Sequence, residues 1–116
     1  MTVTLYGIKS CDTMRKARAW LDEHGVTYAF HDYKAQGIEE ATLRRWVSVV
    51  GWEILLNRAG TTFKKLPPDA KENIDADKAV SLMLSNPSMI KRPVLDNGAI
   101  TVGFRQDAYE ALFSRA

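Results

Sequence analysis

The order of strand and helix patterns in the first third of the chain restricts the fold more than any other sequence feature. Residues 2–8 alternate weakly between apolar and polar side chains, which predicts a strand. Residues 13–24 carry apolar side chains at helical spacing, and a second strand is predicted at about residues 27–33. A strand, a helix and a strand within about thirty residues predict two parallel strands joined by a crossover helix.

The rest of the chain changes from helical to strand patterns. Apolar stripes predict one helix that begins near Ile38 and another at about residues 76–85. Residues 93–104 predict an antiparallel hairpin, in which Asn97-Gly98 is typical of a type I′ turn. A final helix is predicted from about Asp107.

This element order predicts an α/β fold in which helices cover a mixed four-stranded sheet. Of known architectures, it most resembles a thioredoxin-like fold with a helical insertion at about residues 38–88. Because the chain has 116 residues and no linker-like segment, residues 1–116 are predicted to form a single domain.

The composition excludes several classes of protein. A formal net charge of +2 does not favour nucleic-acid binding, and no apolar run is long enough to cross a membrane. The N-terminal residues do not resemble a signal peptide, and one cysteine cannot form an internal disulfide. We therefore expect a cytoplasmic location. The absence of a second cysteine and of clustered carboxylates predicts no metal site.

Cys11, the only cysteine, lies where the first predicted strand gives way to the first helix. Backbone N–H groups and the helix dipole favour a thiolate at such a junction, which makes Cys11 a candidate nucleophile. The alternative is that Cys11 is a small buried apolar residue, as free cysteines often are. The position favours the nucleophile, since the functional thiol of a thioredoxin-like fold follows the first strand.

Three residues near Cys11 affect the pKa of its thiol or the way in which an oxidised thiol can be reduced. Arg15 follows Cys11 by one helical turn and would help to keep the thiolate, whereas Asp12 opposes it or caps the helix. The direction of the pKa shift stays open. Met14 occupies the position of a resolving cysteine, so any oxidised Cys11 requires an external thiol, for which glutathione is the natural supplier.

Two further arginines are candidates for the same site. Pro93 stands at the start of a short predicted strand, and the fold analogy implies a cis bond that would place Arg92 at the sheet end facing Cys11. Arg105 follows the last predicted strand and could point to the same end. Together with Arg15, these planar side chains would suit a carboxylate or a tetrahedral oxyanion.

A set of short motifs, specific in combination and in this order, resembles the arsenate reductase (ArsC) and Spx family, and within it the YffB-like branch. The resemblance covers essentially the full length of the chain. The motifs are Tyr6-Gly7-Ile8, Cys11-x-x-x-Arg15, Leu55-Leu56-Asn57, Gly60-Thr61-Thr62-Phe63, Lys65-Leu66, Asn86-Pro87, Ile90-Lys91-Arg92-Pro93 and Val102-Gly103-Phe104-Arg105.

The resemblance implies a nucleophilic role for Cys11. Arsenate reductases of the family use the matched cysteine to form an arsenate adduct, bind the oxyanion with three arginines, and are turned over by glutathione and glutaredoxin. Arg92 and Arg105 match two of these arginines, whereas Arg58 lies out of register with the third. Spx regulators usually carry Cys-x-x-Cys, which Met14 excludes here.

The resulting prediction is a glutathione-dependent thiol reductase with one nucleophilic cysteine and no resolving cysteine. Glutathione is the expected co-substrate, no tightly bound cofactor is expected, and glutaredoxin or a thiol-containing protein substrate is a candidate partner. A glutaredoxin-coupled arsenate reductase and a non-enzymatic, Spx-like protein-binding regulator remain as alternatives. The predicted catalytic residues are Cys11 and Arg15, and the predicted residues for binding glutathione or substrate are Arg92, Pro93, Arg105 and Arg58.

Overall fold

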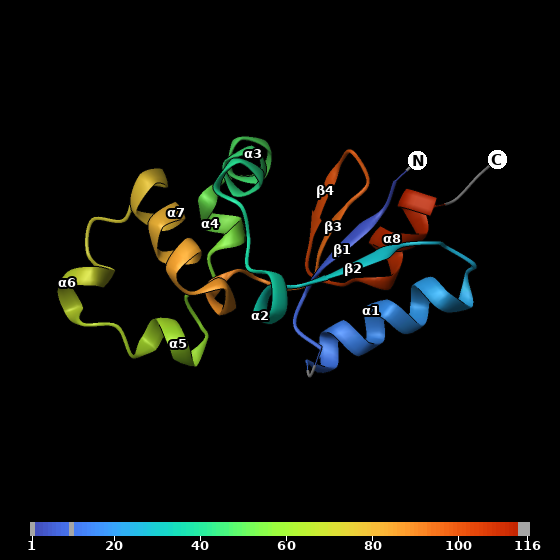
Figure 1. Ribbon diagram of the computed structural model, residues 1–116, viewed down its shortest axis with the longest axis horizontal. Coiled ribbons are helices and arrows are strands. Elements are labelled where there is room, and N and C mark those ends of the chain that lie inside the picture. Colours follow the sequence, from blue (N-terminus) through green and yellow to red (C-terminus); the bar gives the residue numbers. More distant parts are fainter. Residues whose placement is uncertain (1, 10, 114–116) are drawn as a thin grey trace. The chain divides into compact units, whose positions relative to one another are not determined.

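The computed structural model describes residues 2–9 and 11–113, so Ser10 of the predicted loop lies outside the described residues. The chain divides into two compact units, each described here by itself: residues up to 32 together with those from 92 onward, and residues 33–91. Figure 1 shows the elements of both. The first unit contains β1 (Thr4–Gly7), α1 (Asp12–Glu23), β2 (Ala29–Asp32), β3 (Val94–Asp96), β4 (Ile100–Val102) and α8 (Gln106–Phe113).

The first unit contains a mixed four-stranded sheet in the order β2-β1-β3-β4. Strand β1 runs parallel to β2 and antiparallel to β3, and Leu5 is the partner of Phe30 on one side and of Leu95 on the other. Strand β4 is antiparallel to β3. A β-α-β unit followed by a β-β-α unit in one mixed sheet is the thioredoxin-like arrangement, and it confirms the fold class predicted from the sequence.

Helices α1 and α8 share one buried cluster with the sheet. Leu5 and Leu95 of the sheet, Trp20 of α1 and Tyr109 of α8 all belong to this cluster. The rings of Trp20 and Tyr109 meet edge to face, with their centroids 5.6 Å apart. Burying these apolar side chains together stabilises the position of α1 against the strands.

The predicted helix at residues 13–24 is confirmed, since the bounds of α1 differ from it by one residue at each end. Its buried side chains are Met14, Ala17, Trp20 and Leu21. His24 caps its C-terminus, and the Nδ1 atom of the imidazole lies 2.8 Å from the carbonyl oxygen of Trp20. Gly25 follows with a φ of 68°, a conformation that glycine adopts without steric cost, so the helix ends there.

The hairpin of β3 and β4 is confirmed, but its predicted type I′ turn is wrong. Such a turn requires a positive φ at both central residues, and Gly98 has one whereas Asn97 does not. Asp96 pairs with Ile100, so three residues connect the strands. The N–H of Gly98 donates to the Asp96 carboxylate at 3.1 Å, a local bond that supports this longer loop.

The second unit is mainly helical, and Leu56 and Ile90 form an isolated antiparallel bridge within it. Its elements are α2 (Tyr33–Gln36), α3 (Glu40–Val50), α4 (Trp52–Leu55), α5 (Thr61–Lys64), α6 (Pro68–Lys71), α7 (Ala76–Ser85) and the 3-10 helix η1 (Pro87–Met89). The predicted insertion at about 38–88 falls within this unit, and its two longer helices are confirmed. Trp46, Leu55 and Met83 are fully buried and form part of its core. That the two units make a single domain stays a prediction.

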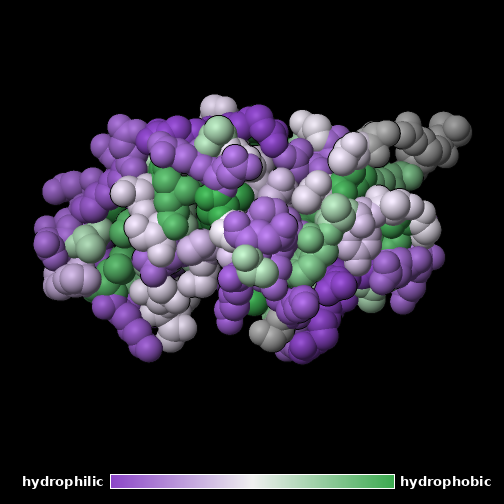
Figure 2. All heavy atoms as spheres, in the orientation of Figure 1, coloured by the Kyte–Doolittle hydropathy of each residue, from purple (hydrophilic) through white to green (hydrophobic). Residues whose placement is uncertain are grey.

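Few large apolar side chains remain exposed in the part of the chain that the structure describes. Val49 and Ile54 of the helical unit are the large ones, with exposed fractions of 60% and 50%. Figure 2 shows mainly hydrophilic residues on the face that it presents. Within residues 2–9 and 11–113, the helices are too short or too polar to cross a lipid bilayer.

Candidate active site

Cys11 is the N-cap residue of α1, with extended backbone angles of φ −98° and ψ 133°. Its carbonyl oxygen accepts the first helical hydrogen bond, from the N–H of Arg15 at 3.0 Å. The side chain is partly exposed and unoxidised, and it packs against the buried cluster of the sheet unit. The thiol therefore lies at the end of the helix where unpaired N–H groups favour an anion.

The pKa of the Cys11 thiol lies below its ordinary value. Burial alone raises this pKa, but the backbone N–H of Met14, the side chain of Arg92 and the backbone N–H of Thr13 together lower it by more. The charge of Arg92 acts in the same direction. Hydrogen bonds and a positive charge directed at the sulfur stabilise the thiolate more than the neutral thiol. The direction of the shift, which the sequence left open, is downward.

Sheet register explains why Arg92 lies beside Cys11. Strand β3 runs antiparallel to β1 and pairs Val94 with Tyr6, so the start of β3 lies next to the end of β1 that leads to Cys11. The Arg92–Pro93 peptide bond is cis, as the fold analogy implied. Pro93 is buried, and its carbonyl oxygen accepts a hydrogen bond from Gly103 at 2.8 Å.

Arg15 has a different neighbour. Its guanidinium forms an ion pair with the carboxylate of Asp12, and both side chains are largely exposed. Of the two arginines, Arg92 is the one that lowers the pKa of the Cys11 thiol. Support of the thiolate by Arg15 stays a prediction.

Arg105 lies at the same end of the sheet as Arg92. Strand β4 is antiparallel to β3, so the end of β4 that precedes Arg105 adjoins the start of β3. The Arg105 guanidinium donates to the Asp107 carboxylate at 2.9 Å, and both side chains are exposed. The hydrogen bond from Arg105 lowers the pKa of Asp107 and outweighs desolvation, which raises it. A ligand that recruits Arg105 must compete with this carboxylate.

Arg58 belongs to the helical unit, where its guanidinium stands 5.6 Å from the centre of the Trp52 ring. Cations bind the faces of aromatic rings in this way. The Arg58 side chain is exposed. Its participation at Cys11 stays a prediction.

Gly7 is a structural determinant of the site that the sequence analysis did not explain. A Cβ atom added to Gly7 would lie 2.2 Å from the Sδ atom of Met14, which is a steric clash. The Met14 side chain is fully buried. The position of a resolving thiol is therefore filled by an apolar side chain that packs closely on β1. No local sequence signal reveals this contact, because it joins a strand to a helix.

The sheet and the candidate site together define a thioredoxin-like protein with a free, partly exposed cysteine at the start of its first helix. Comparison with known proteins is consistent with this class. A family model described as the ArsC family matches residues 6–112. The chain belongs to the ArsC family.

Two solved structures are similar to this chain over nearly its whole length. A structure described as the YffB protein is 61% identical, covers 95% of this chain and 97% of its own, and has a TM-score of 0.93. An arsenate reductase (ArsC) related protein from Brucella melitensis is 58% identical, covers 99% of this chain and 97% of its own, and has a TM-score of 0.77.

Two sequence relatives are more distant. An uncharacterized protein of Haemophilus influenzae is 37% identical, with 97% of this chain and 99% of the relative covered. A global transcriptional regulator Spx of Streptococcus mutans is 32% identical, with 97% of this chain and 84% of the relative covered. The family thus includes proteins named for reductase chemistry and proteins named for regulation.

Proposed function

We propose that this protein is a thiol-based oxidoreductase that reduces disulfides with glutathione and uses Cys11 as its nucleophile. One observation carries the proposal: a partly exposed thiol stands at the N-cap of α1, where Arg92 and the N–H groups of Met14 and Thr13 lower its pKa. A thiol with a lowered pKa and access to solvent is the pattern of a reactive cysteine.

The proposed reaction has two thiol–disulfide exchange steps. The Cys11 thiolate attacks the glutathione sulfur of a mixed disulfide, a new S–S bond forms to Cys11, and the substrate leaves as a thiolate that takes up a proton. The thiolate of a second glutathione then attacks this glutathione sulfur, which releases oxidised glutathione and restores the Cys11 thiolate. One free glutathione is consumed for each mixed disulfide reduced, and the glutathione that the disulfide already carried leaves as the other half of the oxidised glutathione, so no second protein thiol is needed.

The proposed binding site extends from Cys11 along the start of β3. The glutathione backbone would pair beside Arg92 and Pro93, and a glutathione carboxylate would meet Arg105 after displacing Asp107. A charge-assisted hydrogen bond of this kind contributes about 1.5 to 3 kcal/mol when partly desolvated. Arg58 is proposed as a further anion-binding residue.

Arsenate reduction ranks second. It is favoured by the name of the Brucella melitensis relative, an arsenate reductase (ArsC) related protein. An oxyanion requires several donors that converge on one point, and of Arg15, Arg92 and Arg105 only Arg92 acts on the Cys11 thiol among the described residues. The Spx relative supports a third alternative, a regulator that binds a partner protein without turnover.

The experiment is a side-by-side assay of a glutathionylated peptide and of arsenate, with glutathione as the reductant and glutaredoxin added in a parallel series. We expect wild-type protein to reduce the peptide faster than arsenate, and Cys11→Ser to abolish both activities. Full turnover by Cys11→Ser would exclude the proposed nucleophile. Equal or faster reduction of arsenate would promote the second candidate, and no turnover of either would favour the regulator.

A further inference from the structure

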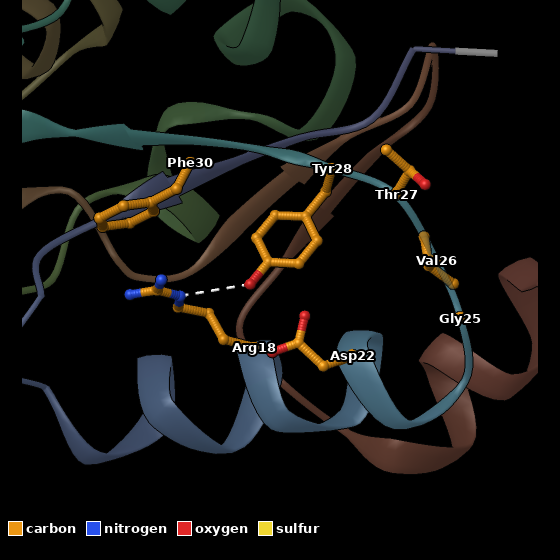
Figure 3. A pocket seen from close by; sticks show the side chains of 7 residues that line it. All are labelled: Arg18, Asp22, Gly25, Val26, Thr27, Tyr28 and Phe30. Carbon is orange, nitrogen blue, oxygen red and sulfur yellow. Dashed lines mark hydrogen bonds between the residues drawn. The ribbon is translucent and has the colours of Figure 1, made fainter.

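A pocket lies between α1 and the beginning of β2, inside the sheet unit. Its volume is about 520 Å³, and Figure 3 shows its lining side chains. Arg18 and Asp22 come from α1, whereas Val26, Tyr28 and Phe30 come from the segment that leads into and forms β2. None of the described residues that line it belongs to the proposed active site, so this pocket requires a separate explanation.

The guanidinium of Arg18 is held in place from two directions. Its Nε atom donates to the hydroxyl of Tyr28 at 3.3 Å, and its Cζ atom lies 4.7 Å from the centre of the Phe30 ring. The two terminal nitrogens make no hydrogen bond to any residue that the structure describes. A planar guanidinium fixed in this way loses little conformational freedom when it binds a carboxylate.

Asp22 brings the opposite charge to the same pocket. It follows Arg18 by one helical turn, so the two side chains start about 5 to 6 Å apart on the same face of α1. Within residues 2–9 and 11–113, the carboxylate of Asp22 has no hydrogen-bond or ion-pair partner, Arg18 included. In Figure 3 both side chains lie on the Tyr28 side of α1. The pocket thus presents one positive and one negative group with unused hydrogen-bonding capacity.

We propose that this pocket binds a small molecule that carries an α-amino-acid zwitterion, with its carboxylate on the terminal nitrogens of Arg18 and its ammonium on Asp22. The ligand's side chain would pack against Val26 and the ring of Tyr28. Charge complementarity selects this class, because Asp22 repels a simple anion or a phosphate and Arg18 repels a simple cation. A ligand with both charges satisfies both groups.

The test is titration of the protein with L-phenylalanine, followed by backbone amide NMR shifts. We expect saturable shifts at residues of α1 and β2 around the pocket, with a Kd of about 1 mM, typical of a small ligand with few contacts. N-acetyl-L-phenylalanine lacks the ammonium and L-phenylalaninamide lacks the carboxylate. Each should bind about tenfold more weakly or worse.

Two pairs of substitutions connect the binding to the two charges. Arg18→Gln and Asp22→Asn should each weaken L-phenylalanine about tenfold. Lys16→Gln and Glu23→Gln make the same charge changes at exposed positions of α1 outside this pocket, and they should leave the affinity unchanged. If loss of Arg18 disturbs the fold, Asp22→Asn still decides the question, since the Asp22 side chain is exposed and its carboxylate has no partner among the described residues.

S-methylglutathione distinguishes two sources of the same chemistry, because its glutamyl end is an α-amino-acid zwitterion and its blocked sulfur cannot react with Cys11. If only L-phenylalanine shifts the amide signals around Arg18, the ligand is a free amino acid. If both probes shift them, the pocket also accepts the glutamyl end of a peptide. The proposal is overturned if neither probe causes saturable shifts at the pocket. It is also overturned if the blocked derivatives bind as well as L-phenylalanine, or if the pocket variants match their controls.

Discussion

At the scale of single residues, the environment of Cys11 depends on a contact across the sheet more than on local spacing. Arg15 is one helical turn from Cys11, but its guanidinium is engaged by Asp12. Arg92 is far away in the sequence, and the antiparallel pairing of β1 with β3 brings it to the thiol. The sequence could identify Cys11 and, by analogy, propose Arg92. It could not show which of Arg15 and Arg92 has the larger effect on the thiol, because that depends on which group each side chain contacts in the fold.

The first prediction concerns the pKa of Cys11. Replacing Arg92 with Gln removes a hydrogen bond and a positive charge that favour the thiolate, so we expect the pKa to rise and alkylation at neutral pH to slow. Arg15→Gln is the matched control and should leave the alkylation profile nearly unchanged. The measurement is the rate of iodoacetamide reaction against pH. A larger effect of Arg15→Gln than of Arg92→Gln would contradict the assignment.

The second prediction concerns stability against pH. The folded-state pKa of Cys11 is lowered, and the thiol of an unfolded chain titrates near pH 8.5. The thiolate therefore stabilises the folded state fully above about pH 8.5, and this contribution is lost as pH falls through the folded-state pKa. Relative to Cys11→Ser, the wild-type free energy of unfolding should rise with pH across this window. Urea unfolding at several pH values measures it, and a difference that falls with pH would refute the lowered pKa.

At the scale of elements, the packing of β1 on α1 depends on the absence of a side chain at Gly7. Gly7→Ala would place a Cβ atom 2.2 Å from the Met14 sulfur, so we expect a loss of about 1 to 3 kcal/mol in the free energy of unfolding. In a Met14→Ala background the same change should cost less, because the clashing atom is gone. A double-mutant cycle by urea unfolding measures this coupling. Equal costs in both backgrounds would rule out the contact as the cause.

Helix α7 provides the test of an element in the helical unit. Asp75 is its N-cap, and the carboxylate accepts a hydrogen bond from the N–H of Lys78 at 2.9 Å. Asp75→Ala should lower the free energy of unfolding by about 1 kcal/mol, whereas Asp75→Asn should cost much less because asparagine also caps helices. Thermal and urea unfolding of the two variants make the comparison. Asp is a favoured cap before an apolar stripe, so this cap can be recognised in the sequence.

Helices with an apolar stripe over several turns could be predicted from the sequence, whereas helices of a single turn could not. Helices α1, α3 and α7 each carry an apolar stripe over several turns, which the sequence displays directly. Helices α2, α4, α5 and α6 contain four residues each, too few for any periodicity. The turn at Gly98 was mispredicted because the Asp96 carboxylate bonds to the loop backbone, which the Asn-Gly pair does not reveal.

At the scale of the whole molecule, the order of elements was sufficient to predict the mixed sheet and the thioredoxin-like class. The order shows which strands are connected through a helix and which through a tight turn. Only a few sheet topologies are compatible with these connections. The candidate site was predictable in part. Cys11, Arg92 and Arg105 lie at one end of the sheet because strand ends meet there, whereas Arg58 belongs to the helical unit, whose loops follow no such rule.

The central claim is that Cys11 carries glutathione as a mixed disulfide during turnover. Intact-protein mass spectrometry after mixing with a glutathionylated peptide tests it most directly, followed by addition of free glutathione. We expect one glutathione on the wild-type protein, located at Cys11 and absent in Cys11→Ser, and we expect free glutathione to remove it at least as fast as steady-state turnover. An unmodified wild-type protein, or an adduct that glutathione clears more slowly than the enzyme turns over, would contradict it.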